Sequence, residues 1–135
     1  MHVLVQIGLV AFGSALGGLL RWGVGIAFAR LVGTAFPWGT FFINISGSLF
    51  LGWFTTFLFD RHLLDSDGWL KREDLHLMIA VGFTGAYTTF STFEYETSKL
   101  LFEDGDFFKG LAYILSSVAV GLIAVRLGMM LARKW

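Results

Sequence analysis

Four long apolar stretches take up most of this chain of 135 residues. The first extends from residue 3 to residue 29. At about 1.5 Å of rise per residue it would form a helix about 40 Å long, enough to cross a bilayer and enter the headgroups. The others lie at about residues 40–59, 75–102 and 107–132. Because a backbone that crosses lipid must satisfy its own hydrogen bonds, the sequence predicts an all-α membrane protein. We expect four transmembrane helices in a single domain, residues 1–135.

The composition excludes several classes of function. Hydrophobic residues make up 56% of the chain and charged residues only 15%, which is too apolar for an ordinary soluble domain of this size. The ten basic and ten acidic residues balance, so no net charge attracts a nucleic acid. The chain has no cysteine, and its histidines, His2, His62 and His76, show no ligand spacing. We therefore expect neither thiol catalysis nor metal-ion catalysis.

The loop charges predict a weak preference for orientation. Four spans would place both chain ends and residues 60–74 on one side of the membrane. The basic residues of that side are Arg61, Lys71, Arg72, Arg133 and Lys134, against Arg30, Lys99 and Lys109 on the other. Lys and Arg normally concentrate on the cytoplasmic side of a membrane protein. Because five basic residues against three is a small difference, the chain could insert in either direction. Two copies in opposite orientations could then build one pore; a weakly but uniquely oriented chain is the alternative.

The first stretch combines small residues with one deep cation. Gly13 and Gly17 form a GxxxG pair, a spacing that lets helix backbones approach closely in lipid. Arg21 stands about two turns before the end of the stretch, with Trp22 beside it. Arg21 either extends to the headgroups or lines a water-filled vestibule, where it would attract anions.

The second stretch contains one amide, Asn44, at membrane depth. An amide in this position must be hydrogen-bonded, and it offers two N–H donors and an acceptor oxygen. Asn44 either joins neighbouring helices or lines a polar path.

The third stretch contains a polar segment, GFTGAYTTFSTFEYE, from Gly82 to Glu96. Its hydroxyl residues are Thr84, Thr88, Thr89, Ser91 and Thr92. Glycine lowers helix propensity, and Thr and Ser offer side-chain partners to backbone groups that a break leaves unpaired. Irregular backbone at membrane depth persists only where protein or an aqueous cavity surrounds it. The segment is therefore either a tightly packed helix contact or the lining of a path for a polar solute.

A regular helix would place one stripe of this segment toward a common lumen or partner. The stripe, with Phe90 at its side, consists of Thr89, Thr92, Phe93 and Glu96. Phenyl edges carry the positive part of the ring quadrupole and can face an anion while excluding water. Such a donor-rich path favours a small anion that accepts hydrogen bonds. These arguments do not separate fluoride from chloride, and an aromatic stripe is also typical of ordinary packing.

Three motifs together resemble the Fluc (CrcB) family of fluoride channels. The first stretch contains GLLRW, which ends at Arg21 and Trp22. The second begins at PWGT, with Asn44 four residues after its threonine, and the third contains GxxxxxTTFSTFxxE. The similarity extends over all four stretches. It implies a fluoride-selective channel that passively exports cytoplasmic fluoride and protects the cell from its toxicity.

The resemblance also implies an architecture and a cofactor. It implies an antiparallel dual-topology homodimer in the bacterial cytoplasmic (inner) membrane, with the third helix broken in mid-membrane. The partners would be fluoride, a second copy of the chain and the bilayer. A structural Na+ at the dimer interface would be held by backbone carbonyls of Gly85 and Thr88. Ala86 and Tyr87 stand where relatives often have a glycine and an aliphatic residue.

Individual side chains match the family's pore residues. Phe90 and Phe93 match its pair of pore phenylalanines, and Arg21 resembles its vestibular arginine. The remaining pore residues that the resemblance implies are Asn44, Ser91, Thr92, Glu96 and Tyr113.

Two other classes of protein are alternatives. A small dual-topology proton-coupled transporter needs a titratable carboxylate deep in an apolar span. The first, second and fourth stretches contain no Asp or Glu, and Glu94 and Glu96 lie late in the third. A helix-packing subunit without transport would explain the glycines but not Asn44 beside the hydroxyls and paired phenylalanines.

Overall fold

The computed structural model describes residues 2–60 and 71–134. Three described helices are long and apolar enough to cross a membrane: α1 (His2–Val32), α2 (Trp38–Asp60) and α6 (Phe107–Lys134). Between α2 and α6 lie five shorter segments: α3 (Arg72–Leu75), η1 (His76–Thr84), α4 (Gly85–Tyr87), α5 (Phe90–Ser98) and η2 (Lys99–Glu103). The segments η1 and η2 have the wider turns of a π-helix. The described residues contain no strand, so the prediction of an all-helical chain is confirmed, and the three long apolar helices agree with a membrane protein.

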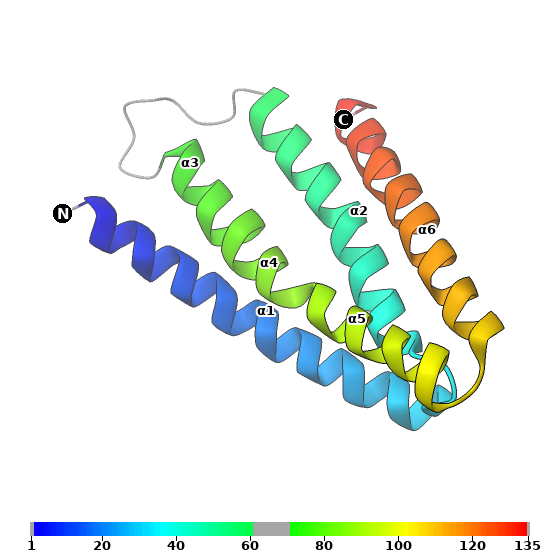
Figure 1. Cartoon of the computed structure of the whole chain (residues 1–135). Helices are drawn as coiled ribbons and strands as arrows, with labels where there is room; N and C mark the ends of the chain where they lie inside the picture. The colour runs from blue at the N-terminus through cyan, green and yellow to red at the C-terminus, as the bar shows by residue number, and fades with distance from the viewer. Residues whose placement is uncertain (1, 61–70, 135) are drawn as a thin grey trace.

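The long helices lie side by side in one bundle (Figure 1). The start of α1, the end of α2 and the end of α6 lie toward one end of the bundle, and the α1–α2 and η2–α6 turns lie at the other. We call this second end the loop end. Helix α1 packs along η1 and α4, while α2 packs along α6. An ion pair of 3.5 Å between Arg133 and Asp60 joins the ends of α6 and α2.

Glycines allow the helices to approach closely. A Cβ atom on Gly13 would collide with the carbonyl oxygen of Met78, and one on Gly17 with that of Phe83. Gly128 of α6 contacts the α2 backbone in the same way. The packing role predicted for the GxxxG pair is therefore confirmed.

Two turns at the loop end depend on glycine. Helix α1 continues beyond residue 29, the predicted end of the span, and stops before Gly33, which has a φ of 80°. Gly105 has a φ of 68° and lies in the predicted turn after η2. Left-handed backbone of this kind costs glycine little. The predicted surface loop at residues 60–74 lies mostly outside the described residues.

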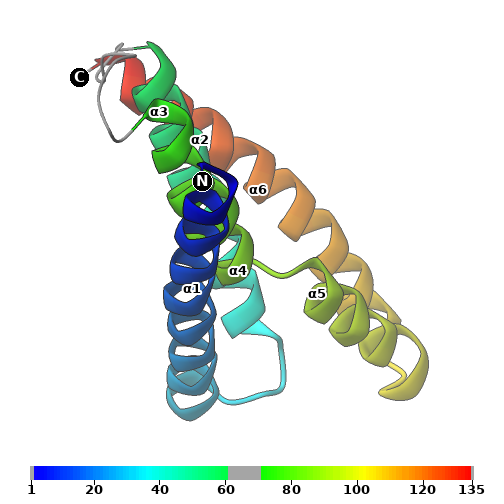
Figure 2. The same ribbon diagram turned by 90° about the vertical axis from the view of Figure 1, so that its left-hand side faces the viewer.

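The helical path is interrupted between α4 and α5. Thr88 (φ −76°, ψ 160°) and Thr89 (φ −151°, ψ 116°) have extended backbone there. Beyond the break α5 diverges from α1 toward the loop end (Figure 2). The break therefore separates a tightly packed half of the bundle from a half in which α1 and α5 stand apart.

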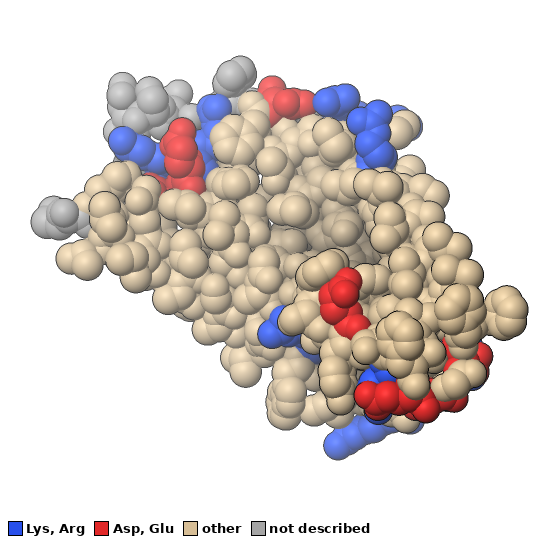
Figure 3. All heavy atoms as spheres, viewed as in Figure 1, with Lys and Arg blue, Asp and Glu red and all other residues tan. Residues whose placement is uncertain are grey.

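Charged side chains gather mainly at the two ends of the bundle (Figure 3). The middle of the face shown is largely uncharged, and a few acidic and basic side chains extend into its loop-end half. This distribution suits a chain whose middle lies in hydrocarbon.

Candidate functional site

A side chain of α2 satisfies the interrupted backbone. The Asn44 Oδ1 atom accepts a hydrogen bond from the Thr89 N–H at 2.8 Å, and Asn44 Nδ2 donates to the Thr89 carbonyl at 3.0 Å. The amide thus pairs with both backbone groups of a residue that lies outside the helices. Buried backbone groups need such partners, so Asn44 stabilises the break.

The hydroxyl of Thr89 caps the helix that follows. Its Oγ1 accepts a hydrogen bond from the Thr92 N–H at 3.3 Å and donates to the Thr92 hydroxyl at 3.0 Å. The Ser91 hydroxyl lies 3.4 Å away. Threonine in extended backbone is a common N-cap, so the sequence itself encodes the restart of the helix at Phe90.

Two carbonyls before the break lose their usual helical donors. In a continuous helix the N–H of Thr89 would donate to Gly85, and that of Thr92 to Thr88. These N–H groups donate to the Asn44 and Thr89 side chains instead. The Thr88 carbonyl accepts a hydrogen bond from Arg21 Nη1 at 3.2 Å. Since a carbonyl has two lone pairs, both oxygens retain capacity for a further partner.

A cavity of about 500 Å³ opens beside the break. Its walls belong to α1, the α1–α2 turn, the start of α2, and the run from α5 through η2 (Figure 2). Its polar and charged lining residues are Arg21, Thr34, Thr40, Thr89, Thr92, Glu96, Lys99 and Asp104. Arg21 reaches the backbone of the break, whereas Asp104 follows η2 at the loop end. The cavity therefore connects the loop end of the bundle with the break.

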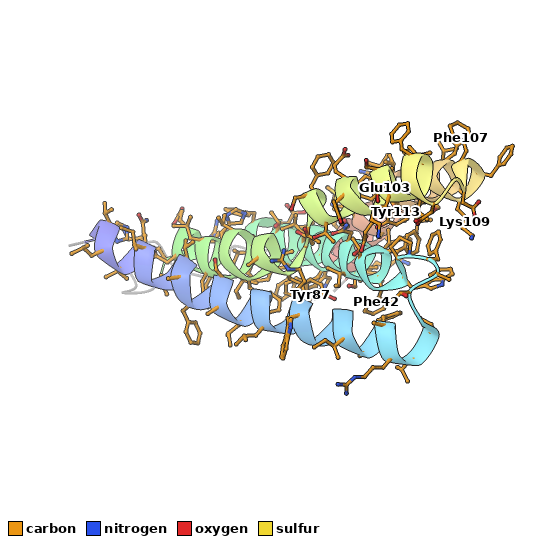
Figure 4. All side chains as sticks on the ribbon, turned by 60° about the horizontal axis from the view of Figure 1, so that its bottom comes forward. Phe42, Tyr87, Glu103, Phe107, Lys109 and Tyr113 are labelled. Carbon is orange, nitrogen blue, oxygen red and sulfur yellow. The ribbon has the colours of Figure 1, made fainter. Side chains whose placement is uncertain are left out.

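Glu96 is held at the cavity wall by hydroxyls from two other helices. Thr40 Oγ1 donates to Glu96 Oε1 at 2.9 Å, and Tyr113 OH donates to Glu96 Oε2 at 2.9 Å. Tyr113 is fully buried and Thr40 is 7% exposed. Figure 4 shows Tyr113 close to α5, and Tyr87 farther along toward α1. Each carboxylate oxygen thus has one fixed donor, which orients the group.

Phe90 and Phe93 differ in their surroundings although their rings lie only 6.0 Å apart, tilted by 43°. Phe93 is 9% exposed and packs on Tyr113 at 5.0 Å. Phe90 is 74% exposed. The pair therefore extends from the interior of the chain to an open face.

That open face carries a polar groove, a hollow of about 240 Å³. Its lining residues are Asn44, Gly47, Ser48, Leu51, Thr88, Thr89 and Phe90. Thr89 lines both this groove and the larger cavity. Residue Thr89 of the break therefore borders both hollows.

The structure divides the predicted single stripe. Because α5 begins at Phe90, Thr89 is a cap and not a helical residue. Thr92 and Glu96 line the cavity, whereas Phe93 belongs to the buried cluster with Tyr113. The break explains only Thr89; the other three residues all belong to α5, and they divide because Phe93 packs on Tyr113 of α6 while Thr92 and Glu96 line the cavity.

Thr40 and Lys99 are not among the site residues predicted from the sequence, although the spacing of each from a predicted site residue indicated it. Thr40 lies four residues before Asn44, and Lys99 lies three residues after Glu96. Both spacings place the side chains on one helix face. Polar residues one helical turn from a predicted site residue are therefore candidates for the same site.

Tyr87, where the chain departs from the resembling family, is buried beside the break. Its hydroxyl lies 2.9 Å from Ser46 Oγ, and its ring stacks on Phe83 with centroids 6.2 Å apart. The ring also borders Gly47 of α2. Gly47 thus leaves room for the ring of Tyr87, and the hydroxyl of Tyr87 connects it to α2 through Ser46.

Comparison with known proteins decides the family. The family model described as "CrcB-like protein, Camphor Resistance (CrcB)" matches residues 8–129. The chain belongs to this family. The matched region includes all predicted site residues of this chain, from Arg21 to Tyr113.

Several similar members of the CrcB-like family carry the name "Fluoride-specific ion channel FluC". The one from Acidobacterium capsulatum is 44% identical over 125 residues, which cover 93% of this chain and 94% of that protein. The one from a Synechococcus species is 40% identical over 126 residues, 93% of this chain and 91% of that protein. The one from Rhizobium meliloti is 38% identical over 125 residues, 93% of this chain and 94% of that protein.

Proposed function

We propose that this chain forms a fluoride-selective channel, which passively exports cytoplasmic fluoride and so protects the cell from fluoride toxicity. The observation that carries the proposal is the cavity with charged and polar lining that leads from the loop end to the break at Thr88 and Thr89, where Asn44 pairs with the backbone. The names of the relatives support fluoride as the transported ion. Passage through a channel makes and breaks no covalent bond, so the chain is not an enzyme.

Along this path the protein replaces the water around the anion with fixed donors. Arg21 attracts the ion into the cavity, and the Thr92 hydroxyl lines the same cavity. Asn44 uses one amide N–H for the Thr89 carbonyl, which leaves its second N–H for an anion in the groove. The rings of Phe90 and Phe93 offer positive edges and exclude bulk water. Ser91, Glu96 and Tyr113 complete the polar track that we assign to the pore.

The polar groove supports a homodimer. The second N–H of Asn44 would lack a partner if the groove were open to lipid, and unsatisfied polar groups are costly there. A second copy covers the groove in our proposal. The two copies are antiparallel, as the weak charge bias allows. The segments from Arg72 to Glu103 then form a fourth, broken span, and the dimer resides in the bacterial cytoplasmic membrane.

The residues at the break fit a sodium ion in this dimer. Gly85 and Thr88 would hold it through the carbonyls that have lost helical donors, since small hard cations prefer oxygen ligands. Bound there, the ion supplies a positive charge shared by both subunits. Sodium, compared with an equal concentration of N-methylglucamine, should raise the melting temperature of the purified dimer. Equal melting temperatures in both salts would contradict the site.

The alternative is a small dual-topology proton-coupled transporter with Glu96 as its carboxylate. Such a mechanism needs the carboxylate to exchange its partners during transport. Glu96 is instead held by the hydroxyls of Thr40 and Tyr113. The channel names of the relatives do not favour this alternative either.

Efflux from liposomes tests the function directly. Liposomes loaded with potassium fluoride or potassium chloride are treated with valinomycin, and ion-selective electrodes measure release. We expect fast fluoride release, negligible chloride release, and no dependence on a proton gradient. Protein-free liposomes are the control. Equal chloride release would contradict selectivity, and a requirement for a proton gradient would favour the coupled transporter.

A further inference from the structure

The cavity contains a second cation besides Arg21. Lys99, at the start of η2, lines the same cavity. Arg21 belongs to the α1 wall and Lys99 to the wall that continues from α5, and Figure 2 shows these two walls diverging toward the loop end. Lys99 makes no ion pair within the part of the chain that the structure describes. Its charge is therefore not neutralised by a direct partner.

The charged groups are arranged in sequence along the cavity. Thr92, Glu96 and Lys99 follow one another at intervals of four and three residues, and all line the cavity. Arg21 lies at the inner end because it bonds to the backbone of the break. Lys99 lies one turn farther toward the loop end than Glu96, and Asp104 follows η2 at the loop end itself. An anion that enters would thus pass Lys99 before it reaches Arg21.

Whether the cavity attracts or repels an anion depends on Lys99, because carboxylates also line it. Two carboxylates, Glu96 and Asp104, line the cavity together with the two cations. Without Lys99, Arg21 alone would face both carboxylates, and the cavity would repel anions. With Lys99 the formal charges balance, and the positive groups lie deeper than Asp104.

We propose that Lys99 sets the concentration of fluoride at the pore entrance by neutralising the carboxylates of the cavity. The proposal rests on the channel function proposed above. It assigns to Lys99 and Asp104 opposite electrostatic effects on a small inorganic anion. Neither residue needs to touch the ion for these effects, because a charge acts through the solvent in the cavity.

Initial fluoride efflux at two ionic strengths tests this role. At about 10 Å in water a unit charge changes the local anion concentration about twofold. At about 0.01 M salt Lys99→Gln should therefore lower efflux about twofold, Lys99→Glu about fourfold, and Asp104→Asn should raise it about twofold. In about 1 M potassium gluconate the screening length falls to about 3 Å, so all three variants should match the unmodified channel.

The ion pair of Lys109 and Asp106 provides the matched control at the same end of the molecule. These residues form an exposed salt bridge of 2.5 Å and lie outside the lining of the cavity. Lys109 holds the pKa of the Asp106 carboxyl below its usual range, so the pair is neutral as a whole. The double variant Asp106→Asn with Lys109→Gln removes both charges and should leave efflux unchanged.

The outcomes separate this inference from the channel proposal. If the unmodified protein conducts fluoride while Lys99→Gln and Asp104→Asn behave like it at low salt, the role of Lys99 is wrong and the channel stands. A loss in Lys99→Gln that is equal at both ionic strengths indicates a structural effect and also overturns the proposal. If Lys99→Gln does not assemble, the exposed Asp104→Asn variant decides alone. No fluoride conduction by the unmodified protein overturns both proposals.

Discussion

The Asn44 side chain pairs with the backbone of Thr89 through both of its polar ends, at 2.8 Å and 3.0 Å. One residue of α2 thereby supplies partners for both backbone groups of Thr89 at the break. The arrangement needs an acceptor and a donor at the same position, which an amide supplies and a carboxylate does not. The identity of residue 44 is thus linked to the geometry of the break.

Asn44→Asp should lower fluoride efflux about tenfold or more. The variant loses the donor to the Thr89 carbonyl and places a negative charge beside the path of an anion. Hydrogen bonds that involve charged groups contribute about 1.5–3 kcal/mol, and about 1.4 kcal/mol corresponds to a factor of ten. The measurement is liposome efflux. Gln6→Glu, the same change of amide to acid near the start of α1, should retain efflux; normal efflux in Asn44→Asp would exclude Asn44 from the pore.

Phe90→Ile and Phe93→Ile should both lower efflux but differ in stability. Phe90 is exposed in the single chain, whereas Phe93 is buried against Tyr113. We expect only Phe93→Ile to destabilise the folded chain, by about 1–3 kcal/mol, because it changes the shape of a packed core. Thermal unfolding in detergent measures the difference. Normal efflux in both variants would contradict the assigned pore lining.

The hydroxyls around Glu96 should act as a unit. Thr40→Val and Tyr113→Phe each remove one donor from the carboxylate, which should cost about 1–3 kcal/mol and lower efflux. Combined with Glu96→Gln, either change should have a smaller effect than alone, because residues of one network are not additive. Double-mutant cycles on stability and efflux measure this coupling. Strictly additive effects would show that these hydroxyls do not act through Glu96.

Gly17→Ala should destabilise the fold while Gly18→Ala should not. A Cβ on Gly17 would collide with the Phe83 carbonyl, and one on Gly18 meets nothing within 4 Å. Overpacking typically costs about 1–3 kcal/mol, whereas alanine at an open helical position gains up to about 1 kcal/mol in helix propensity. Melting temperature and elution as a single dimer peak provide the measurement. Equal stability of the two variants would contradict the close approach of α1 and η1.

Much of the fold follows from local properties of the chain. Apolar stretches of this length leave helices as the way to satisfy the backbone in lipid. The GxxxG spacing indicated the close contact at Gly13 and Gly17, and the TTFSTF motif with Asn44 indicated the family. The cap formed by Thr89 is also local, because its partner Thr92 lies three residues away.

The sequence by itself thus determined the helices, their small-residue contacts and the family. The tertiary structure decided which distant residues meet. Thr40 and Tyr113 converge on Glu96 from separate helices, and Phe93 packs on Tyr113 while its neighbours in sequence line the cavity. Helical periodicity could not predict this division, because Phe93 and its neighbours belong to the same helix α5 and only the position of Tyr113 on α6 distinguishes them. The physical reason is that periodicity fixes only the direction of a side chain on its own helix, whereas the neighbours that it meets depend on how separate helices pack.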